Sequence, residues 1–259
     1  MERTRNKLDW EQDLPEDKAA LWFLGQAGYM LKSGNCTVLI DPYLTDSVGD
    51  KNPSFSRTYP PPVEPGEIRA DIFIATHDHT DHMDPKAIAA YMFKDTTMFV
   101  SPRHAARHLR ELGIGETQIR VVDHGDFVDL PGARIEGVFA LATGADVVDT
   151  AGYKITFTNG KSVYHTSDTA YCDLLLKACP YADVLLTCIN GKFGNLNVAQ
   201  AIELTWAVKP KYVIPNHYDV MALNSENPKT YEYFYELSKK GRTDEASCVI
   251  LDVLRRFEW

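Results

Sequence analysis

The stretch that decides the fold reads Ile74-Ala75-Thr76-His77-Asp78-His79-Thr80-Asp81-His82-Met83-Asp84-Pro85. The apolar run over 70–75 predicts a buried strand that ends at Thr76, so the His/Asp cluster begins where the backbone leaves a sheet. His77 and His79 are two positions apart, and such residues point to the same side of an extended segment. Both imidazoles can therefore face one metal ion. Asp81 and His82 follow, and a bend there can aim them at a second point nearby.

The ligand types in this cluster predict the kind of metal. Imidazole and carboxylate suit zinc and other first-row divalent ions, and the absence of a nearby Cys argues against a structural thiolate site. The alternative is a polar loop whose histidines face water. Three His and two Asp between positions 77 and 82 disfavour that alternative.

The bulk composition indicates a globular intracellular protein. The chain has 259 residues, 44% of them hydrophobic, and we expect one domain over 1–259 with residues 1–18 as a polar amino-terminal arm. The net charge of -9 disfavours nucleic acid and anionic membrane as partners, although it allows a local basic pocket. The five cysteines form no CxxC pair, which is typical of reduced thiols in the cytoplasm. No secretory signal and no apolar run near the ~20 residues of a membrane span are apparent.

Strand patterns and helical patterns alternate along the rest of the chain. Further strands are expected at 21–24, 28–32, 36–40, 97–101, 118–122, 126–130, 134–139, 152–158, 161–165, 183–188, 211–215 and 247–253. Helices are expected at 85–94 with Asp84 as N-cap, and at 102–112, 198–208 and 228–240. This order predicts an α+β fold in which two sheets pack face to face with helices outside.

Two more residues of metal-ligand type follow predicted strands. Asp168 comes after the strand at 161–165, and His217 comes after the strand at 211–215. Functional groups often lie on loops at strand ends because a rigid sheet positions them. Taken alone, Asp168 is as well explained as a helix N-cap, and His217 as a loop histidine.

A second histidine pair lies on the predicted helix 102–112. His104 and His108 are four apart and share one helical face. A metal site there is conceivable, but the interleaved arginines would repel a cation: Arg103, Arg107 and Arg110. We interpret the two histidines as surface residues.

Together, these segments resemble the metallo-β-lactamase superfamily, with its H-x-H-x-D-H motif, later Asp and late His after a strand. Within that superfamily the chain looks most like the UlaG-type L-ascorbate-6-phosphate lactonases, over roughly residues 20–240. The resemblance rests on the motif at 75–84 and on Leu24-Gly25-Gln26-Ala27-Gly28, Tyr164-His165-Thr166-Ser167-Asp168 and Val213-Ile214-Pro215-Asn216-His217-Tyr218-Asp219. It implies a four-layer αββα sandwich and a possible homo-oligomer.

The resemblance also implies the ligands of one or two divalent ions, Mn²⁺ or Zn²⁺. One ion would be bound by His77, His79 and Asp168, and the second by Asp81, His82, Asp168 and His217, with Asp168 bridging. Asp41 matches an early Asp that is usually structural. The superfamily usually supplies a further His to the first ion from the segment before the bridging Asp, but residues 139–146 contain none. Either Asp146 substitutes, or the first site is weak, or one metal suffices.

The expected activity is hydrolysis. A bound divalent ion lowers the pKa of water toward about 7, and Asp81 is the candidate catalytic proton shuttle. The resemblance implies a lactonase acting on a small anionic substrate, a sugar-phosphate lactone such as L-ascorbate 6-phosphate. Candidate substrate-binding residues are Arg57, Lys192, Asn190 and Asn224. The alternatives are a phosphodiesterase, nuclease or phospholipase of the same superfamily, or a non-catalytic metal-binding member with an incomplete site.

Overall fold

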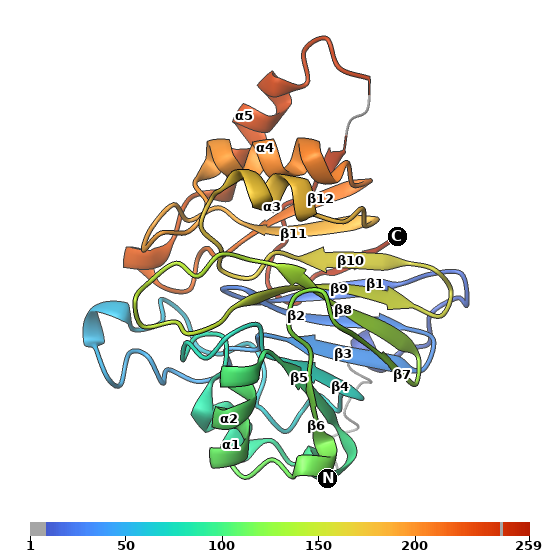
Figure 1. Ribbon diagram of the computed structural model, residues 1–259, viewed down its shortest axis with the longest axis vertical. Coiled ribbons are helices and arrows are strands. Elements are labelled where there is room, and N and C mark those ends of the chain that lie inside the picture. The colour runs from blue at the N-terminus through green and yellow to red at the C-terminus, as the bar shows by residue number, and fades with distance from the viewer. Residues whose placement is uncertain (1–8, 244–245) are drawn as a thin grey trace, which may run out of the picture.

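Two mixed sheets stacked face to face form the centre of the computed structural model, which describes residues 9–243 and 246–259 (Figure 1). The first sheet has the order β14-β1-β2-β3-β4-β5-β6. Its strands are β1 Ala20–Gly25, β2 Gly28–Ser33, β3 Cys36–Ile40, β4 Ile72–Ile74, β5 Met98–Ser101, β6 Ile119–Val121 and β14 Arg256–Glu258. The second sheet has the order β13-β12-β11-β10-β9-β8-β7. Its strands are β7 Phe127–Leu130, β8 Ala133–Phe139, β9 Ala151–Phe157, β10 Ser162–His165, β11 Val184–Cys188, β12 Tyr212–Asn216 and β13 Ser247–Cys248.

Helices cover the outer face of each sheet. The first sheet is covered by α1 Pro85–Ala90 and α2 Arg103–Glu111, and the second by α3 Asp173–Ala178, α4 Val198–Val208 and α5 Pro228–Ser238 (Figure 1). Short 3-10 helices occur at Asp9–Glu11, Pro53–Phe55, Lys94–Thr96, Glu116–Gln118 and Ala222–Asn224. The predicted four-layer αββα arrangement is confirmed.

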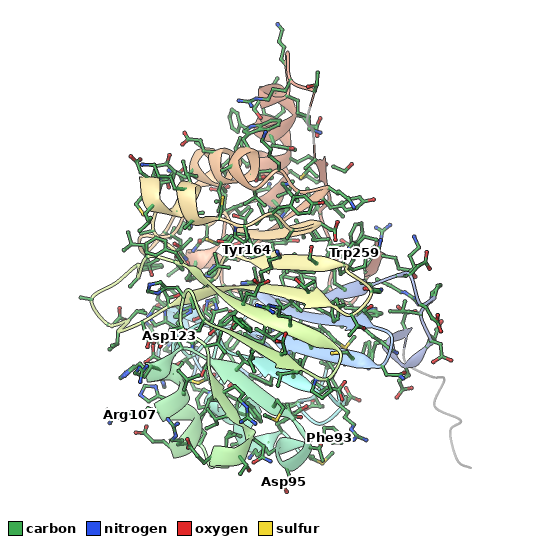
Figure 2. The ribbon with its side chains drawn as sticks, turned by 45° about the vertical axis from the view of Figure 1, so that its right-hand side comes forward. Phe93, Asp95, Arg107, Asp123, Tyr164 and Trp259 are labelled. Atoms are coloured by element: carbon green, nitrogen blue, oxygen red, sulfur yellow. The ribbon has the colours of Figure 1, made fainter. Side chains whose placement is uncertain are left out.

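The alternation of side chains along β1 explains why the layers stack. Leu21 and Phe23 point into the core between the two sheets, whereas Trp22 and Leu24 point into the core beneath α1 and α2. All four are buried, because a strand covered on both faces sends successive side chains into opposite layers. In the second sheet, Tyr164 of β10 lies in the core under the helices, and Figure 2 labels it together with Trp259, which lies in the core between the sheets.

Two predicted elements have different bounds in the structure. The helix expected over 85–94 ends at Ala90, because Tyr91 adopts an extended backbone and its ring packs against Phe73 and Phe99. The strand expected over 247–253 pairs with β12 only at Ser247–Cys248. The chain then crosses to the first sheet, where β14 pairs with β1; neither β14 nor α3 is among the predicted elements.

Residues 1–8 of the predicted amino-terminal arm lie outside the described part of the chain. From Asp9 onward the segment lies against the first sheet: the Asp9 carboxylate accepts a hydrogen bond from Trp22, and Lys32 donates to the Trp10 carbonyl. Within residues 9–243 and 246–259, no helix has the length and apolar character needed to cross a membrane.

Candidate metal centre

The centre lies where parallel strands of the two sheets end. Strands β3, β4 and β5 run parallel in the first sheet, and β10, β11 and β12 run parallel in the second. Asp41 follows β3, the His/Asp cluster follows β4, Asp168 follows β10 and His217 follows β12. Because parallel strands end at the same edge, segments far apart in the sequence deliver their polar side chains to one place.

The structure brings all the predicted ligands together in two groups. In the first group, Nε2 of His77 lies 3.0 Å from Nδ1 of His79, and both lie near Asp168. The second group consists of Asp81, His82 and His217, whose ligand atoms lie within 4.8 Å of one another.

Asp168 lies between the two groups. Its Oδ1 is 3.4 Å from Nε2 of His82, and its Oδ2 is 3.2 Å from Nε2 of His217. The same carboxylate belongs to the group of His77 and His79. This position is what a bridging ligand requires.

The donor atoms fit one or two divalent ions. Nε2 of His82 and Oδ1 of Asp168 are buried and make no hydrogen bond within the described residues, which is costly for polar atoms unless something else satisfies them. Two ligands at about 2.0–2.1 Å from a tetrahedral ion are about 3.3 Å apart. The separations of 3.2 and 3.4 Å that join Asp168 to His217 and His82 match this spacing.

Charges within the centre offset one another. Burial alone would lower the pKa of His82, but the carboxylates of Asp168, Asp81 and Asp41 outweigh burial and raise this pKa well above its usual range. Burial would raise the pKa of Asp168, but His217 and His82 hold it well below its usual range. Burial, together with His82, lowers the pKa of His77, so its imidazole is neutral and can bind a metal ion through a lone pair. The raised pKa favours protonation of His82 in the absence of metal.

Asp41 orients the His82 ring. Asp41 accepts hydrogen bonds from the backbone N–H of Thr76 (2.8 Å) and from the Thr76 hydroxyl (2.7 Å). Its Oδ2 also lies 2.7 Å from Nδ1 of His82. The structural role that the resemblance implies for Asp41 is consistent with these contacts, since a carboxylate on the far ring nitrogen fixes the tautomer of a metal-ligating histidine.

Gln26 is a site residue whose role the sequence does not reveal, although it lies in one of the segments that carry the resemblance. Its Nε2 donates to Oδ2 of Asp81 at 2.9 Å, and its backbone carbonyl accepts a hydrogen bond from the N–H of His217 at 2.7 Å. Both Gln26 and His217 have positive φ, 57° and 64°, so this close pairing holds two strained backbone segments together. Asn195 was also missed; its amide donates to Oδ2 of Asp168 at 2.7 Å.

Asp146 reaches the first group from the segment that lacks a histidine. Its Oδ2 lies 3.4 Å from Nε2 of His79, and its side chain is largely exposed. Of the three explanations for the missing histidine, substitution by Asp146 agrees best with this contact.

A cavity of about 290 Å³ opens beside the centre and is lined by Asp81, Asp168 and His79. Lys51 and Asn224 also line it, and Phe55 and Phe193 form an apolar part of its wall, with ring centroids 5.8 Å apart. Lys51 was not among the predicted substrate-binding residues.

The four predicted substrate-binding residues are placed differently. Asn224 lines the cavity and accepts a hydrogen bond from the Asn190 amide at 2.7 Å. Arg57 does not line the cavity: its guanidinium donates to the backbone carbonyls of Tyr43 and Tyr59 and lies over both rings. The ammonium of Lys192 donates to the carbonyl of Ser225, and Lys192 lines a different groove. The two cations predicted to bind substrate, Arg57 and Lys192, therefore donate hydrogen bonds to backbone carbonyls of the loops.

The fold and the clustered ligands define a metal-binding αββα protein, and comparison with known proteins gives its family. A family model described as the beta-lactamase superfamily domain matches residues 20–217. A UPF0173 metal-dependent hydrolase of Thermoplasma acidophilum is 28% identical over 222 residues, covering 84% of this chain and 90% of the relative. The chain belongs to the β-lactamase superfamily and is one of its metal-dependent hydrolases.

Two further comparisons cover nearly the whole chain. A probable L-ascorbate-6-phosphate lactonase UlaG of Escherichia coli O139:H28 is 26% identical over 302 residues, covering 98% of this chain and 84% of the relative. The metallo hydrolase Igni18 of Ignicoccus hospitalis superposes with a TM-score of 0.72 at 21% identity, covering 93% of this chain and 98% of that one. This second likeness shows the shared fold.

Proposed function

We propose that the protein hydrolyses the ring ester of a small anionic lactone, a sugar-phosphate lactone such as L-ascorbate 6-phosphate. The observation that carries the proposal is that Lys51 lines the same cavity as Asp81 and Asp168 of the metal centre. A phosphorylated lactone needs a cation for its phosphate at some distance from the hydrolytic groups. The similarity to a probable L-ascorbate-6-phosphate lactonase over 98% of the chain supports this substrate class.

Different residues of the chain have different roles in the proposed reaction. A divalent ion, Mn²⁺ or Zn²⁺, would be held by the two ligand groups around Asp168 and would supply Lewis-acid activation of water. Asp81 is 13% exposed and faces the cavity, so it can accept a proton from the attacking water. The water oxygen bonds to the carbonyl carbon, the ring C–O bond breaks, and Asp81 returns the proton to the leaving ring oxygen. Gln26, which donates to Asp81, orients its carboxylate for both transfers.

Lys51, and not Arg57 as predicted from the sequence, is the loop cation that would bind the substrate phosphate. Its ammonium donates to the hydroxyl of Thr80 at 3.1 Å, and the side chain is exposed at the cavity. Lys51 is therefore available for a phosphate, whereas Nε and Nη1 of Arg57 donate to carbonyls and Arg57 does not line this cavity. Asn224 adds an amide that can bind a sugar hydroxyl.

A substrate and metal panel tests the proposal. The protein, stripped with a chelator and reconstituted with Mn²⁺ or Zn²⁺, is assayed on L-ascorbate 6-phosphate, an unphosphorylated lactone and a phosphodiester. We expect turnover of the phosphorylated lactone that disappears on chelation, returns with metal and is abolished in Asp81→Asn. Turnover of the phosphodiester alone would replace the lactonase proposal by the phosphodiesterase alternative. No turnover of any substrate with either ion would favour the non-catalytic alternative.

A further inference from the structure

A third group of metal-ligand side chains lies outside the centre described above. It consists of Asp78, from the loop after β4, and of His104 and His108 on α2. Oδ2 of Asp78 is 3.5 Å from Nε2 of His104 and 3.3 Å from Nδ1 of His108. The centroids of the two imidazole rings lie 4.8 Å apart, and the angle between the ring planes is 61°. The three residues are distinct from the ligands of the first two groups, although Asp78 lies between His77 and His79 in the sequence.

We propose that Asp78, His104 and His108 bind a divalent transition-metal ion, zinc, at a site separate from the metal centre. The separations of 3.3 and 3.5 Å are close to the spacing of about 3.3 Å expected between ligands of a tetrahedral zinc ion. One carboxylate and two imidazoles from an i, i+4 pair are a common ligand set for zinc.

The other oxygen of the Asp78 carboxylate is unsatisfied. The side chain of Asp78 is only 9% exposed, and its Oδ1, unlike the Oδ2 that faces the two histidines, has no hydrogen-bond partner among residues 9–243 and 246–259, so an ion bound by both oxygens would satisfy it. A buried carboxylate oxygen without a partner is unfavourable unless a cation or water satisfies it. The half-exposed histidines leave a path by which such an ion can enter.

The arginines of α2 do not oppose a cation at this place. Each of them pairs with a carboxylate: Arg103 with Asp123, Arg107 with Glu111 and Arg110 with Glu116. The Arg107 side chain is 69% exposed, and Figure 2 labels Arg107 at the outer side of α2 and Asp123 near the amino end of the helix. The interpretation of His104 and His108 as simple surface residues is therefore incomplete, because both are half-buried and face Asp78.

The site would keep an open position. A cavity of about 270 Å³ is lined by Asp78 and His108, and it shares Lys51 and Thr80 with the cavity beside the metal centre. Three protein ligands with a fourth position open to water are typical of exchangeable zinc rather than of closed structural sites. An ion here would tie the loop that carries His77 and His79 to helix α2.

Zinc stoichiometry tests the proposal without reference to hydrolysis. The full chain is stripped with a chelator and titrated with Zn²⁺ against a chromogenic competitor, in parallel with His104→Gln/His108→Gln. The matched control is His124→Gln, since His124 is an exposed turn histidine outside the three groups. We expect the double variant to bind about one equivalent less than the wild type and the control to bind the same amount.

A crystallographic measurement keeps the proposal testable if the double variant fails to fold. Crystals of the wild-type protein grown with Zn²⁺ should show an anomalous peak at the zinc edge between Asp78, His104 and His108. Equal zinc stoichiometry in the wild type and the folded double variant, or the absence of that peak, would overturn the proposal. Either result would leave the hydrolase assay unaffected, so failure of this site and failure of the lactonase proposal are distinguishable.

Discussion

Nδ1 of His82 lies 2.7 Å from Oδ2 of Asp41, and both side chains are fully buried. Because the carboxylate accepts the Nδ1 proton, Nε2 of His82, which faces Asp168, is the ring nitrogen that would bind a metal ion. Asp41 has a positive φ of 47° and is held at the end of β3 by two hydrogen bonds from Thr76. Asp41, at the end of β3, thus sets the tautomer of His82, which lies in the segment after the neighbouring strand β4.

Asp41→Asn should weaken metal binding without loss of the fold. The amide can present its NH₂ to Nδ1, which favours the wrong tautomer of His82, and outer partners of this kind are worth about 10–100-fold in metal affinity. Competition with a chelator of known affinity measures the change. Asp71→Asn is the matched control, since Asp71 also accepts a backbone N–H beside β4 but lies away from the centre. Unchanged affinity in a folded Asp41→Asn protein would contradict this role.

Gln26→Leu should impair turnover more than substrate binding. Leucine keeps the approximate volume of glutamine but removes the hydrogen bond to Asp81, so the carboxylate loses its orientation. We expect kcat to fall about 10–100-fold with a smaller change in KM. The pH dependence of kcat should also shift. Gln26→Glu is the informative companion, because it places a second negative charge beside Asp81 and should shift the profile toward higher pH. A change in KM alone would show that Gln26 contacts substrate instead.

The sequence predicts the metal centre better than it predicts the substrate cavity, and the reason is physical. His77, His79, Asp168 and His217 follow strands that hydrophobic patterns mark clearly, and parallel strands bring their ends together whatever the loops do. Lys51 lies in a long loop between β3 and β4, where no periodicity indicates which side chains face inward. The sequence therefore favoured Arg57 from the same loop, although its guanidinium binds loop carbonyls.

Long-range pairing accounts for most of what the sequence did not predict in the fold. Strand β14 is three residues long and pairs with β1, more than two hundred positions earlier in the chain. A segment this short has too few residues for an alternation to be detected. Likewise, the spacing of His104 and His108 shows that they share a face, but only the tertiary structure shows that Asp78 lies opposite that face.

Lys51→Gln should raise KM for a phosphorylated lactone and leave KM for an unphosphorylated lactone unchanged. A charge-assisted hydrogen bond to phosphate contributes about 1.5–3 kcal/mol, less at an exposed position, so we expect about a tenfold increase in KM. Lys192→Gln serves as the control, because Lys192 lies on a neighbouring loop and donates to the Ser225 carbonyl. An equal increase for both substrates would mean that Lys51 shapes the cavity rather than binding phosphate.

Asp183 links three strands of the second sheet, and its removal should destabilise the protein in a pH-dependent manner. Its carboxylate accepts hydrogen bonds from the N–H of Ser162 in β10 (2.9 Å) and from Lys211 beside β12 (2.8 Å). Its side chain is 8% exposed. Burial opposes ionisation of this carboxyl, but the contacts from Lys211 and Ser162 outweigh burial and lower the pKa of Asp183.

The sign of the pH dependence follows from that lowered pKa. A carboxyl whose pKa is lower in the folded than in the unfolded protein contributes stability that is fully present above the unfolded value, 3.8. This contribution is lost as the pH falls through the folded value. We expect Asp183→Asn to reduce the free energy of unfolding by about 1–3 kcal/mol at pH 7. The difference from wild type should shrink progressively below about pH 4.

Urea unfolding of the metal-free wild type and of Asp183→Asn, followed in steps from neutral to acidic pH, measures this difference. Metal is omitted so that proton release at the metal centre does not contribute to the comparison. Asp129→Asn is a suitable control, because the Asp129 side chain is 67% exposed and lies 3.5 Å from Arg134, so the change should affect stability little at any pH. A destabilisation of Asp183→Asn that stays constant down to acidic pH would show that the loss comes from packing and neutral hydrogen bonds. In that case the charge of Asp183 would not be what holds β10, β11 and β12 in register.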